Sequence, residues 1–397
     1  MPFLDPDRSE TIGFQQEVAR LEALLEASRQ IHGALQLDDV LHCALKITVK
    51  ELEADGAFFS SNGAIETARQ TFYGDVPNGW REISGKDCEA CASVPLLDKR
   101  GRLLTTLVVL RHEKPLSLEE HDFLEGLALQ SAVAVENARQ HERLLAWERA
   151  QQDLAAARAV QTSLLPHNIP EIAGYGLDFR CRTCYEVGGD YLDIFLLPDG
   201  RYMMTVADVA GKGFASALVS GSFRAAFRAM AAAGLPLDEL AGRMNDLHHN
   251  DGPEARRKYV TAIVMRLDAE RHELEMVNAG HNPGFLTDEH GQYHLIKASG
   301  PPLGMFPKTE YAVEHHSISQ GGKLMLYTDG LTEVSRGDDE FGTERLLSTF
   351  LQSTESRCGV FLDCLWEELS EFADGGKQQD DMTALALIRY RAEGAAA

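Results

Sequence analysis

The sequence has no long hydrophobic run, few cysteines and a shortage of basic residues. No apolar stretch approaches the roughly 18–20 residues that cross a bilayer, and residues 1–8 lack the basic-then-apolar pattern of a secretory signal. Seven cysteines among 397 residues argue against a disulfide framework. Because 38 Lys and Arg face 61 Asp and Glu, the formal charge of −23 repels nucleic-acid phosphates and anionic lipid. We therefore expect a cytoplasmic protein with no nucleic-acid or membrane partner.

The remaining composition is that of an ordinary globular protein. Apolar residues make up 44% of the chain and charged residues 25%, which is enough for hydrophobic cores in two or three domains of α+β class. We divide the chain into an N-terminal segment (1–20), a first α+β domain (21–140), a helical linker (141–168), a second α+β domain (169–391) and a tail (392–397).

The first domain has a helix–helix opening followed by short strands. Apolar residues recur at helical spacing over 15–35, and a second helix begins at Leu37. Strands are predicted at 56–60, 92–97 and 103–110, with a glycine turn between the last two. The helical opening and the segments at 92–110 and 117–137 resemble a GAF sensory domain. The resemblance implies an α/β sensor whose ligand the sequence does not identify.

The linker is predicted to be one long helix. Residues 117–165 contain no proline and a single glycine. A coiled-coil seam with alternating spacings of three and four is formed by Trp147, Ala150, Leu154, Ala157, Gln161 and Leu164. We predict a homodimer that forms through this linker and the GAF-like domain. The alternative is a helix that packs on its own domain.

A hairpin in the second domain predicts two facing carboxylates. The turn at 198–200 separates two apolar runs. If Leu197 pairs with Arg201, Asp190 lies opposite Asp208, with Cβ atoms about 5 Å apart. Like charges at that distance destabilise a sheet unless a cation lies between them. Carboxylate oxygens favour Mg²⁺ or Mn²⁺, so the hairpin predicts a divalent metal site.

Two further segments place aspartates at strand ends. Asp329 follows the apolar run 323–327, and the pair Asp380 and Asp381 precedes the run 382–388. Each alone is common turn chemistry. Together with the hairpin they predict one acidic cluster around two metal ions.

Seven short segments, one in the linker and six in the second domain, form a pattern in a fixed order. They are Gln161–Pro166, Val187–Tyr191, Ala207–Gly213, Asn278–Pro283, Gly300–Gly304, Tyr327–Glu333 and Asp380–Thr383. They resemble the metal-dependent type-2C (PPM) protein Ser/Thr phosphatases, in particular their bacterial SpoIIE/RsbU-like branch. The resemblance implies an antiparallel β-sandwich flanked by helix pairs, with two Mn²⁺ or Mg²⁺ ions. It also implies a phosphoprotein substrate, a STAS-domain anti-sigma factor antagonist.

The same resemblance assigns roles to individual residues. It implies that Asp190 and Asp208 form the catalytic metal pair and that Val209 offers its backbone carbonyl. The remaining metal ligands that it implies are Asp329, Asp380 and, ranked behind Asp380, Asp381. Two other functions stay open: a catalytically inactive phosphatase fold that acts as a scaffold, and a small-molecule sensor. Retention of the acidic cluster argues against the scaffold.

Other reactive side chains are expected to be structural. His281 is expected to brace its loop. The pairs His248–His249 and His315–His316 are expected to be surface or cap residues rather than ligands. The pairs Cys88–Cys91 and Cys181–Cys184 are too far apart in sequence to favour a shared zinc site.

Overall fold

The computed structural model describes residue 18 and residues 21–60, 72–75, 91–111 and 114–391. Cys88 lies outside these residues. The chain divides into two compact units, Met1–Gln151 and Gln152–Ala397. Within the described ranges, no helix combines the length and the apolar character that crossing a membrane requires.

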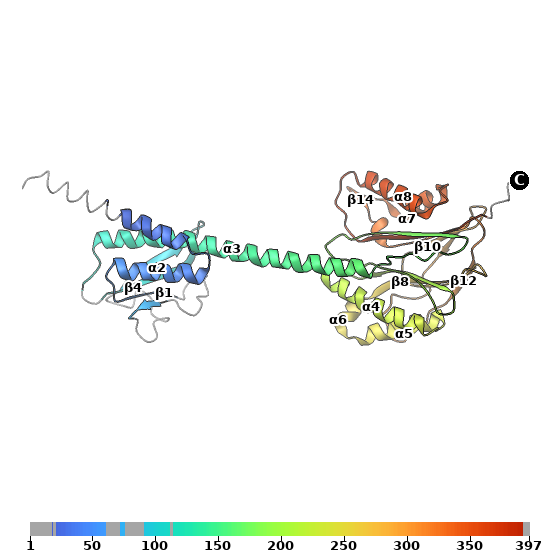
Figure 1. The fold of residues 1–397 in the computed structure, drawn as a ribbon, viewed down its shortest axis with the longest axis horizontal. Helices are drawn as coiled ribbons and strands as arrows, with labels where there is room; N and C mark the ends of the chain where they lie inside the picture. The colour runs from blue at the N-terminus through green and yellow to red at the C-terminus, as the bar shows by residue number, and fades with distance from the viewer. Residues whose placement is uncertain (1–17, 19–20, 61–71, 76–90, 112–113, 392–397) are drawn as a thin grey trace, which may run out of the picture. The chain divides into compact units, whose positions relative to one another are not determined.

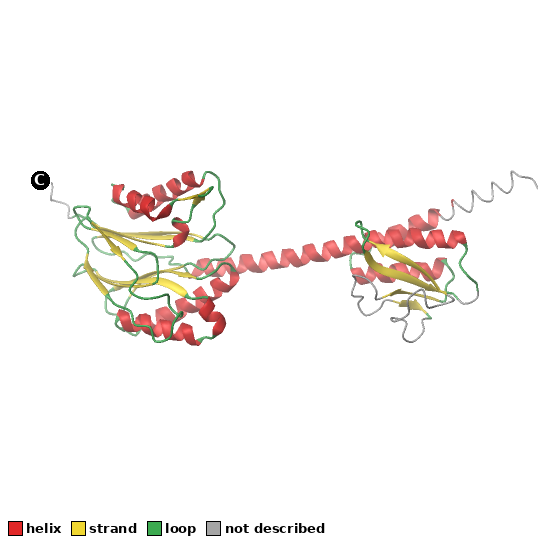
Figure 2. Ribbon diagram, turned by 180° about the vertical axis from the view of Figure 1, so that it is seen from behind, coloured by secondary structure: helices red, strands yellow, loops and turns green. Residues whose placement is uncertain are grey.

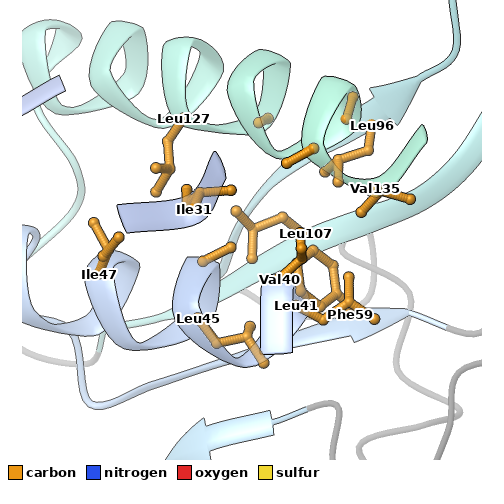
Figure 3. Packing of buried hydrophobic residues seen from close by; sticks show 14 of the residues in the cluster. Ile31, Val40, Leu41, Leu45, Ile47, Phe59, Leu96, Leu107, Leu127 and Val135 are labelled. Atoms are coloured by element: carbon orange, nitrogen blue, oxygen red, sulfur yellow. The ribbon is translucent and has the colours of Figure 1, made fainter. Parts of the chain in front are cut away.

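The first unit is built on a four-stranded antiparallel sheet with strand order β2-β1-β4-β3. Its elements are a helix at residues 21–32, α2 (Leu37–Glu51), β1 (Gly56–Ser60), β2 (Phe72–Gly74), β3 (Cys91–Leu97) and β4 (Leu103–Leu110). Ile31, Leu41, Leu107 and Leu127 meet in its buried core (Figure 3). The three strands predicted from the sequence are confirmed. The assignment to the GAF family stays a prediction.

Helix α3 (Leu118–Leu164) confirms the long helix that the sequence predicted over 117–165. Its buried residues belong to the part between Phe123 and Ala138. Residues 142–150 are exposed, and the Trp147 side chain is 61% exposed. The seam around Trp147 therefore lacks cover within the described chain, and the dimeric coiled coil stays a prediction.

The second unit has four layers, with two antiparallel five-stranded sheets between two groups of helices (Figures 1 and 2). One sheet has the order β11-β10-β13-β16-β5 and the other β12-β9-β8-β7-β6. The strands of the first are β11 (Tyr293–Ile296), β10 (Gly284–Thr287), β13 (Lys323–Tyr327), β16 (Met382–Arg389) and β5 (Tyr175–Arg182). The strands of the second are β12 (Glu314–Ser317), β9 (Glu273–Ala279), β8 (Val260–Asp268), β7 (Tyr202–Val209) and β6 (Tyr191–Leu196).

Helices cover the outer faces of both sheets. The helices α4 (Phe214–Ala232) and α5 (Leu237–Asn250) pack on the β6–β7 sheet, and α7 (Gly342–Gln352) and α8 (Cys358–Ala373) pack on the other (Figure 1). The smaller elements are α6 (Pro253–Arg257), the 3₁₀ turn η2 (Asp329–Leu331), β14 (Ser335–Arg336) and β15 (Asp339–Glu340). Both predicted helix pairs are confirmed.

The alternation of apolar residues along the strands explains the layers. On β7, Met203 and Ala207 belong to the core under α4 and α5, whereas Met204 and Val206 belong to the core between the sheets. Successive strand residues point to opposite faces, so a strand that is apolar on both faces must be covered twice. This pattern specifies a sandwich with an outer helical layer.

One buried ion pair fastens α4 to the hairpin. Asp193 on β6 has no exposed surface, and its two carboxylate oxygens accept hydrogen bonds of 2.6 Å from Arg228 Nε and Nη2. Tyr191 donates a third hydrogen bond of 2.5 Å to the same carboxylate. The Arg228 guanidinium also lies 4.9 Å from the ring centroid of Phe195. The pair is bidentate, and although the Arg228 side chain is 40% exposed, the Asp193 carboxylate is fully buried, so loss of its partner would leave a buried charge unpaired.

Replacing Arg228 with Met should destabilise the second unit. Asp193 would keep a buried charge without its partner, and we expect the free energy of unfolding in urea to fall by about 2–4 kcal/mol. The matched control is Arg243→Met, because Arg243 pairs with Glu239 on the exposed surface of α5. That change should cost less than about 1 kcal/mol. Equal losses in the two variants would contradict the role assigned to the Asp193 pair.

Candidate metal centre

The hairpin has the register that the turn predicted. Leu197 N–H donates to Arg201 O at 2.8 Å, and Tyr191 pairs with Ala207 on the neighbouring strand. Asp190 directly precedes Tyr191, and Asp208 directly follows Ala207. The two aspartates therefore belong to the same open end of the hairpin.

Glycines allow the surrounding loops to approach this end. A Cβ atom on Gly189 would lie 2.9 Å from the Val209 carbonyl oxygen and 3.2 Å from Asp208 Oδ1. A Cβ atom on Gly188 would collide with the Asp381 carboxylate, and one on Gly330 with the Asp381 backbone. These positions accept no larger residue without movement of a neighbour. The Gly-Gly and Asp-Gly pairs in the sequence are thus packing requirements of the cluster.

Two threonine hydroxyls hold the Asp190 side chain. Asp190 is 7% exposed, and its Oδ2 atom accepts hydrogen bonds from Thr328 Oγ1 at 2.8 Å and Thr383 Oγ1 at 2.5 Å. Thr328 precedes Asp329, and Thr383 lies two residues after Asp381. The hydroxyls therefore join three distant segments at one carboxylate. Both threonines lie in segments that carry the family resemblance, but no pattern in the sequence predicted these hydrogen bonds.

Asp381 braces the loop that carries Asp190. Its Oδ1 atom accepts the Cys184 N–H and its Oδ2 atom accepts the Gly189 N–H, both at 2.7 Å. Asp381 is 6% exposed, and burial raises the pKa of its carboxyl group. These contacts are those of a positioning residue.

Asp380 faces a cation of the chain itself. Lys212 Nζ lies 2.7 Å from Asp380 Oδ2, and the hydrogen bond to this carboxylate raises the pKa of Lys212. Within the described part of the chain, no three of the aspartates bring oxygens within 4.8 Å of one another. The aspartates thus lie in one region, but no three of the described carboxylates are close enough to bind one ion together.

The proximity of the carboxylates raises their pKa values. Burial, followed by the charge of Asp208, raises the pKa of Asp190 well above its usual range. Burial, followed by the charges of Asp329, Asp380 and Asp381, raises the pKa of Asp208 to about 7. Burial and the charge of Asp380 also raise the pKa of Asp329. A divalent cation would relieve this repulsion, and carboxylates beside the Val209 carbonyl form the hard oxygen set that Mg²⁺ and Mn²⁺ prefer.

Gln161 links the end of α3 to the same loop. Its amide donates to the Gly188 carbonyl at 2.7 Å and accepts the Gly188 N–H at 3.0 Å. Gly188 lies two residues before Asp190, so the position of this helix end bears directly on the cluster. Gln161 belongs to a family motif and to the predicted coiled-coil seam, and neither pattern predicted this contact.

His281 is a neutral brace. Its Nε2–H donates to the Tyr327 carbonyl at 3.0 Å, so Nδ1 accepts the Thr261 hydroxyl at 2.8 Å. Burial lowers the pKa of His281 to about 4. The expectation that this histidine supports its loop is confirmed. It anchors the backbone two residues before Asp329.

Arg180, on the strand before the hairpin, is engaged elsewhere. Arg180 Nε donates to Asp363 at 2.8 Å on α8, and Arg180 Nη1 lies 3.1 Å from Asp178 on its own strand. One carboxylate of α8 and one of β5 therefore hold the Arg180 guanidinium. Lys212, in contrast, forms an ion pair with Asp380 of the cluster.

Removing one charge from the cluster should have opposite effects with and without metal. In EDTA at pH 8, Asp208→Asn should raise the free energy of unfolding, by on the order of 2–4 kcal/mol, because the amide relieves repulsion. In excess Mg²⁺ the wild type should become the more stable protein, because the variant has lost a ligand. Urea unfolding under both conditions measures the reversal. A variant that is less stable than the wild type in EDTA would contradict the repulsion.

The lowered pKa of His281 predicts an acid-dependent loss of stability. The unfolded chain takes up this proton near pH 6.5 and the folded chain only near pH 4. The contribution of neutral His281 to the free energy of unfolding is therefore complete above pH 6.5. It falls as the pH drops toward 4, by up to about 3 kcal/mol. In His281→Gln, the free energy of unfolding in urea should depend less on pH between 6.5 and 4 than it does in the wild type. Substitution of the exposed His315 should leave this pH dependence unchanged. Parallel pH profiles for the wild type and His281→Gln would refute the assignment.

Comparison with known proteins agrees with this geometry. The family described as Stage II sporulation protein E (SpoIIE) matches residues 198–390. The chain is 33% identical to phosphoserine phosphatase RsbP of Bacillus subtilis over 185 residues, 46% of this chain and 45% of that protein. It is 27% identical to protein IcfG of Synechocystis sp. over 263 residues, 60% of this chain and 41% of that protein. The chain thus spans less than half the length of these two relatives.

A solved structure shows the same fold. The SiaA-PP2C domain of Pseudomonas aeruginosa matches with a TM-score of 0.54 at 20% identity, over 62% of this chain and 99% of that domain. The residues that the family matches include Asp208, Asp329, Asp380 and Asp381. The second unit is therefore similar to the SpoIIE/RsbU-like branch of the PPM phosphatases and has their fold.

Proposed function

We propose that this protein is a cytoplasmic Mn²⁺- or Mg²⁺-dependent phosphatase that hydrolyses phosphoserine or phosphothreonine on a signalling protein. The observation that carries the proposal is the burial of Asp190 beside Asp208, which raises the pKa of both. Repulsion between buried carboxylates destabilises a fold unless a bound cation offsets it. Two relatives, RsbP and RsbU, are named phosphoserine phosphatases, which supports the reaction class.

The proposed division of labour follows the contacts. Asp190 and Asp208 would hold two ions between them with the Val209 carbonyl, and Asp329 and Asp380 would complete the set. When bound, two such ions supply an activated water and neutralise charge on the phosphoryl oxygens. The hydroxyls of Thr328 and Thr383 fix one oxygen of Asp190, which leaves the other oxygen for an ion. Asp381 is a second-rank ligand, because backbone N–H groups already engage both of its oxygens.

The positive charge of Lys212 offsets part of the negative charge of the aspartate cluster. Its ammonium group pairs with Asp380 and also donates to the Gln379 carbonyl at 2.5 Å. Its side chain is 42% exposed. Metal binding would release Asp380 from Lys212, and the freed ammonium would then lie beside the site of an incoming phosphate.

The proposed substrate is a phosphorylated STAS-domain protein that antagonises an anti-sigma factor. Support comes from the SpoIIE/RsbU-like character of the second unit. Because the chain carries a formal charge of −23, a phosphoprotein would approach against repulsion. The bound cations would therefore be needed for substrate binding as well as for the chemistry.

The proposed regulation acts through the end of α3. Gln161 holds Gly188, and Arg224 Nε of α4 donates to the Leu164 carbonyl at 3.2 Å. An open groove of 320 Å³ lies along this helix end and is lined by Ala157, Leu164, Tyr191, Ala217 and Leu218. A loosely packed helix end can shift at lower cost than one in a close-packed core. A signal in the GAF-like domain, carried by a dimeric α3, would thereby move the Asp190 loop.

The direct test is phosphate release by the full-length protein from a phosphorylated STAS-domain protein. We expect release with Mn²⁺ and none with EDTA. Asp190→Asn and Asp208→Asn should each lower the rate by more than about 100-fold, because several kcal/mol of transition-state stabilisation depend on the ions.

The matched control is Asp199→Asn, which alters the turn at the other end of the same hairpin. It should retain the rate of the wild type, because Asp199 contacts Arg201 and none of the cluster residues. Release that persists in EDTA, or wild-type rates in Asp208→Asn, would exclude the proposed reaction. Mn²⁺ binding without any release would favour the scaffold.

A further inference from the structure

Three potential metal ligands meet at the edge of the sandwich away from the aspartate cluster. The group consists of His294, Glu314 and His316. β11 and β12, which carry these residues, are the edge strands of the two sheets. The loop with Asp190 joins β5 and β6, which form the opposite edges. The group is therefore separate from the phosphatase site.

Strand register shows that all three side chains belong to the inner faces of the sheets. His294 pairs with Leu286 on β10, Glu314 pairs with Met276 on β9, and His316 pairs with Leu274 on β9. These three apolar partners belong to the core between the sheets. Because paired residues share a face of a sheet, the group lies where the core meets solvent.

The ligand atoms are close enough for one ion. Glu314 Oε2 lies 3.0 Å from His316 Nε2 and 3.5 Å from His294 Nε2. The two ring centroids are 4.7 Å apart, and all three ligand atoms lie within 4.8 Å of one another. Ligands at about 2.0–2.2 Å from a tetrahedral zinc ion are themselves about 3.4 Å apart. Small rotations of exposed side chains cover the difference, since His294 is 56% and Glu314 33% exposed.

We propose that His294, Glu314 and His316 bind one Zn²⁺ ion that ties the edge of one sheet to the edge of the other. Two imidazoles and one carboxylate form a zinc ligand set, unlike the all-oxygen set of the aspartate cluster. Water from the solvent side would complete the tetrahedron. A single ion would join the two edge strands and so stabilise the sandwich. His316 is half-buried, with 18% of its side chain exposed, whereas its neighbour His315 is exposed.

The test is Zn²⁺ binding to the full-length protein by calorimetry, in excess Mg²⁺ to occupy the aspartate cluster. We expect the wild type to bind one equivalent of Zn²⁺. The affinity should fall by more than about 10-fold in His316→Ala and in His294→Ala, because mutation of a residue that merely supports a metal ligand already lowers affinity by about that factor. The matched control is His315→Ala on the outer face of β12, which should bind as the wild type does. Co²⁺ should give the intense visible absorption of a tetrahedral site in the wild type and in His315→Ala.

Thermal unfolding provides a second readout. Zn²⁺ should raise the midpoint of the wild type and leave that of His294→Ala unchanged. His294 is the most exposed of the three residues, so its replacement should leave the metal-free protein folded. Equal Zn²⁺ affinity in His294→Ala and His315→Ala, or no Zn²⁺ binding in excess Mg²⁺, would overturn the proposal whether or not the protein is a phosphatase.

Discussion

Repulsion between carboxylates at the open end of one hairpin is the constraint on which the second unit depends. Asp190 and Asp208 are brought together by strand pairing, and burial adds the cost of desolvation. Hydrogen bonds from Thr328 and Thr383 to Asp190 offset part of this electrostatic destabilisation. The ion pair between Lys212 and Asp380 offsets a further part. What remains uncompensated is the negative charge that divalent cations would balance.

The same constraint explains why long-range contacts converge on one loop. Asp381 holds the Gly189 N–H from the end of β16, and Gln161 holds Gly188 from the end of α3. Because Asp190 in this loop is repelled by neighbouring carboxylates, small changes in the hydrogen bonds from Gln161 and Asp381 can shift the loop. The hydrogen bonds of Gln161 therefore link the position of the end of α3 to the position of the Asp190 loop within the second unit.

The two edges of the sandwich differ in their chemistry. One edge gathers carboxylates and a carbonyl, which are hard donors for Mg²⁺ or Mn²⁺. The other gathers His294, Glu314 and His316, which suit Zn²⁺. Because the donor types differ, the two sites would select different ions from the same solution. Catalytic and structural metals could thus act independently in one domain.

Local sequence determined most of the elements and the hairpin. The turn at 198–200 set the register that pairs Tyr191 with Ala207, because a short loop leaves few alignments of its strands. The absence of proline likewise predicted α3 to within a few residues. These features depend on neighbours in the chain, and the sequence contains that information directly. The GAF assignment and the dimer stay predictions.

Tertiary structure alone decided which polar groups meet. The hydroxyl of Thr383 reaches Asp190 across 193 residues of chain, and Asp381 proved to brace backbone N–H groups that no spacing rule relates to it. His294 and His316 come together because each lies on the edge strand of a different sheet. Such contacts follow from how the two sheets stack, and that stacking is set by the summed burial of many side chains rather than by any local pattern.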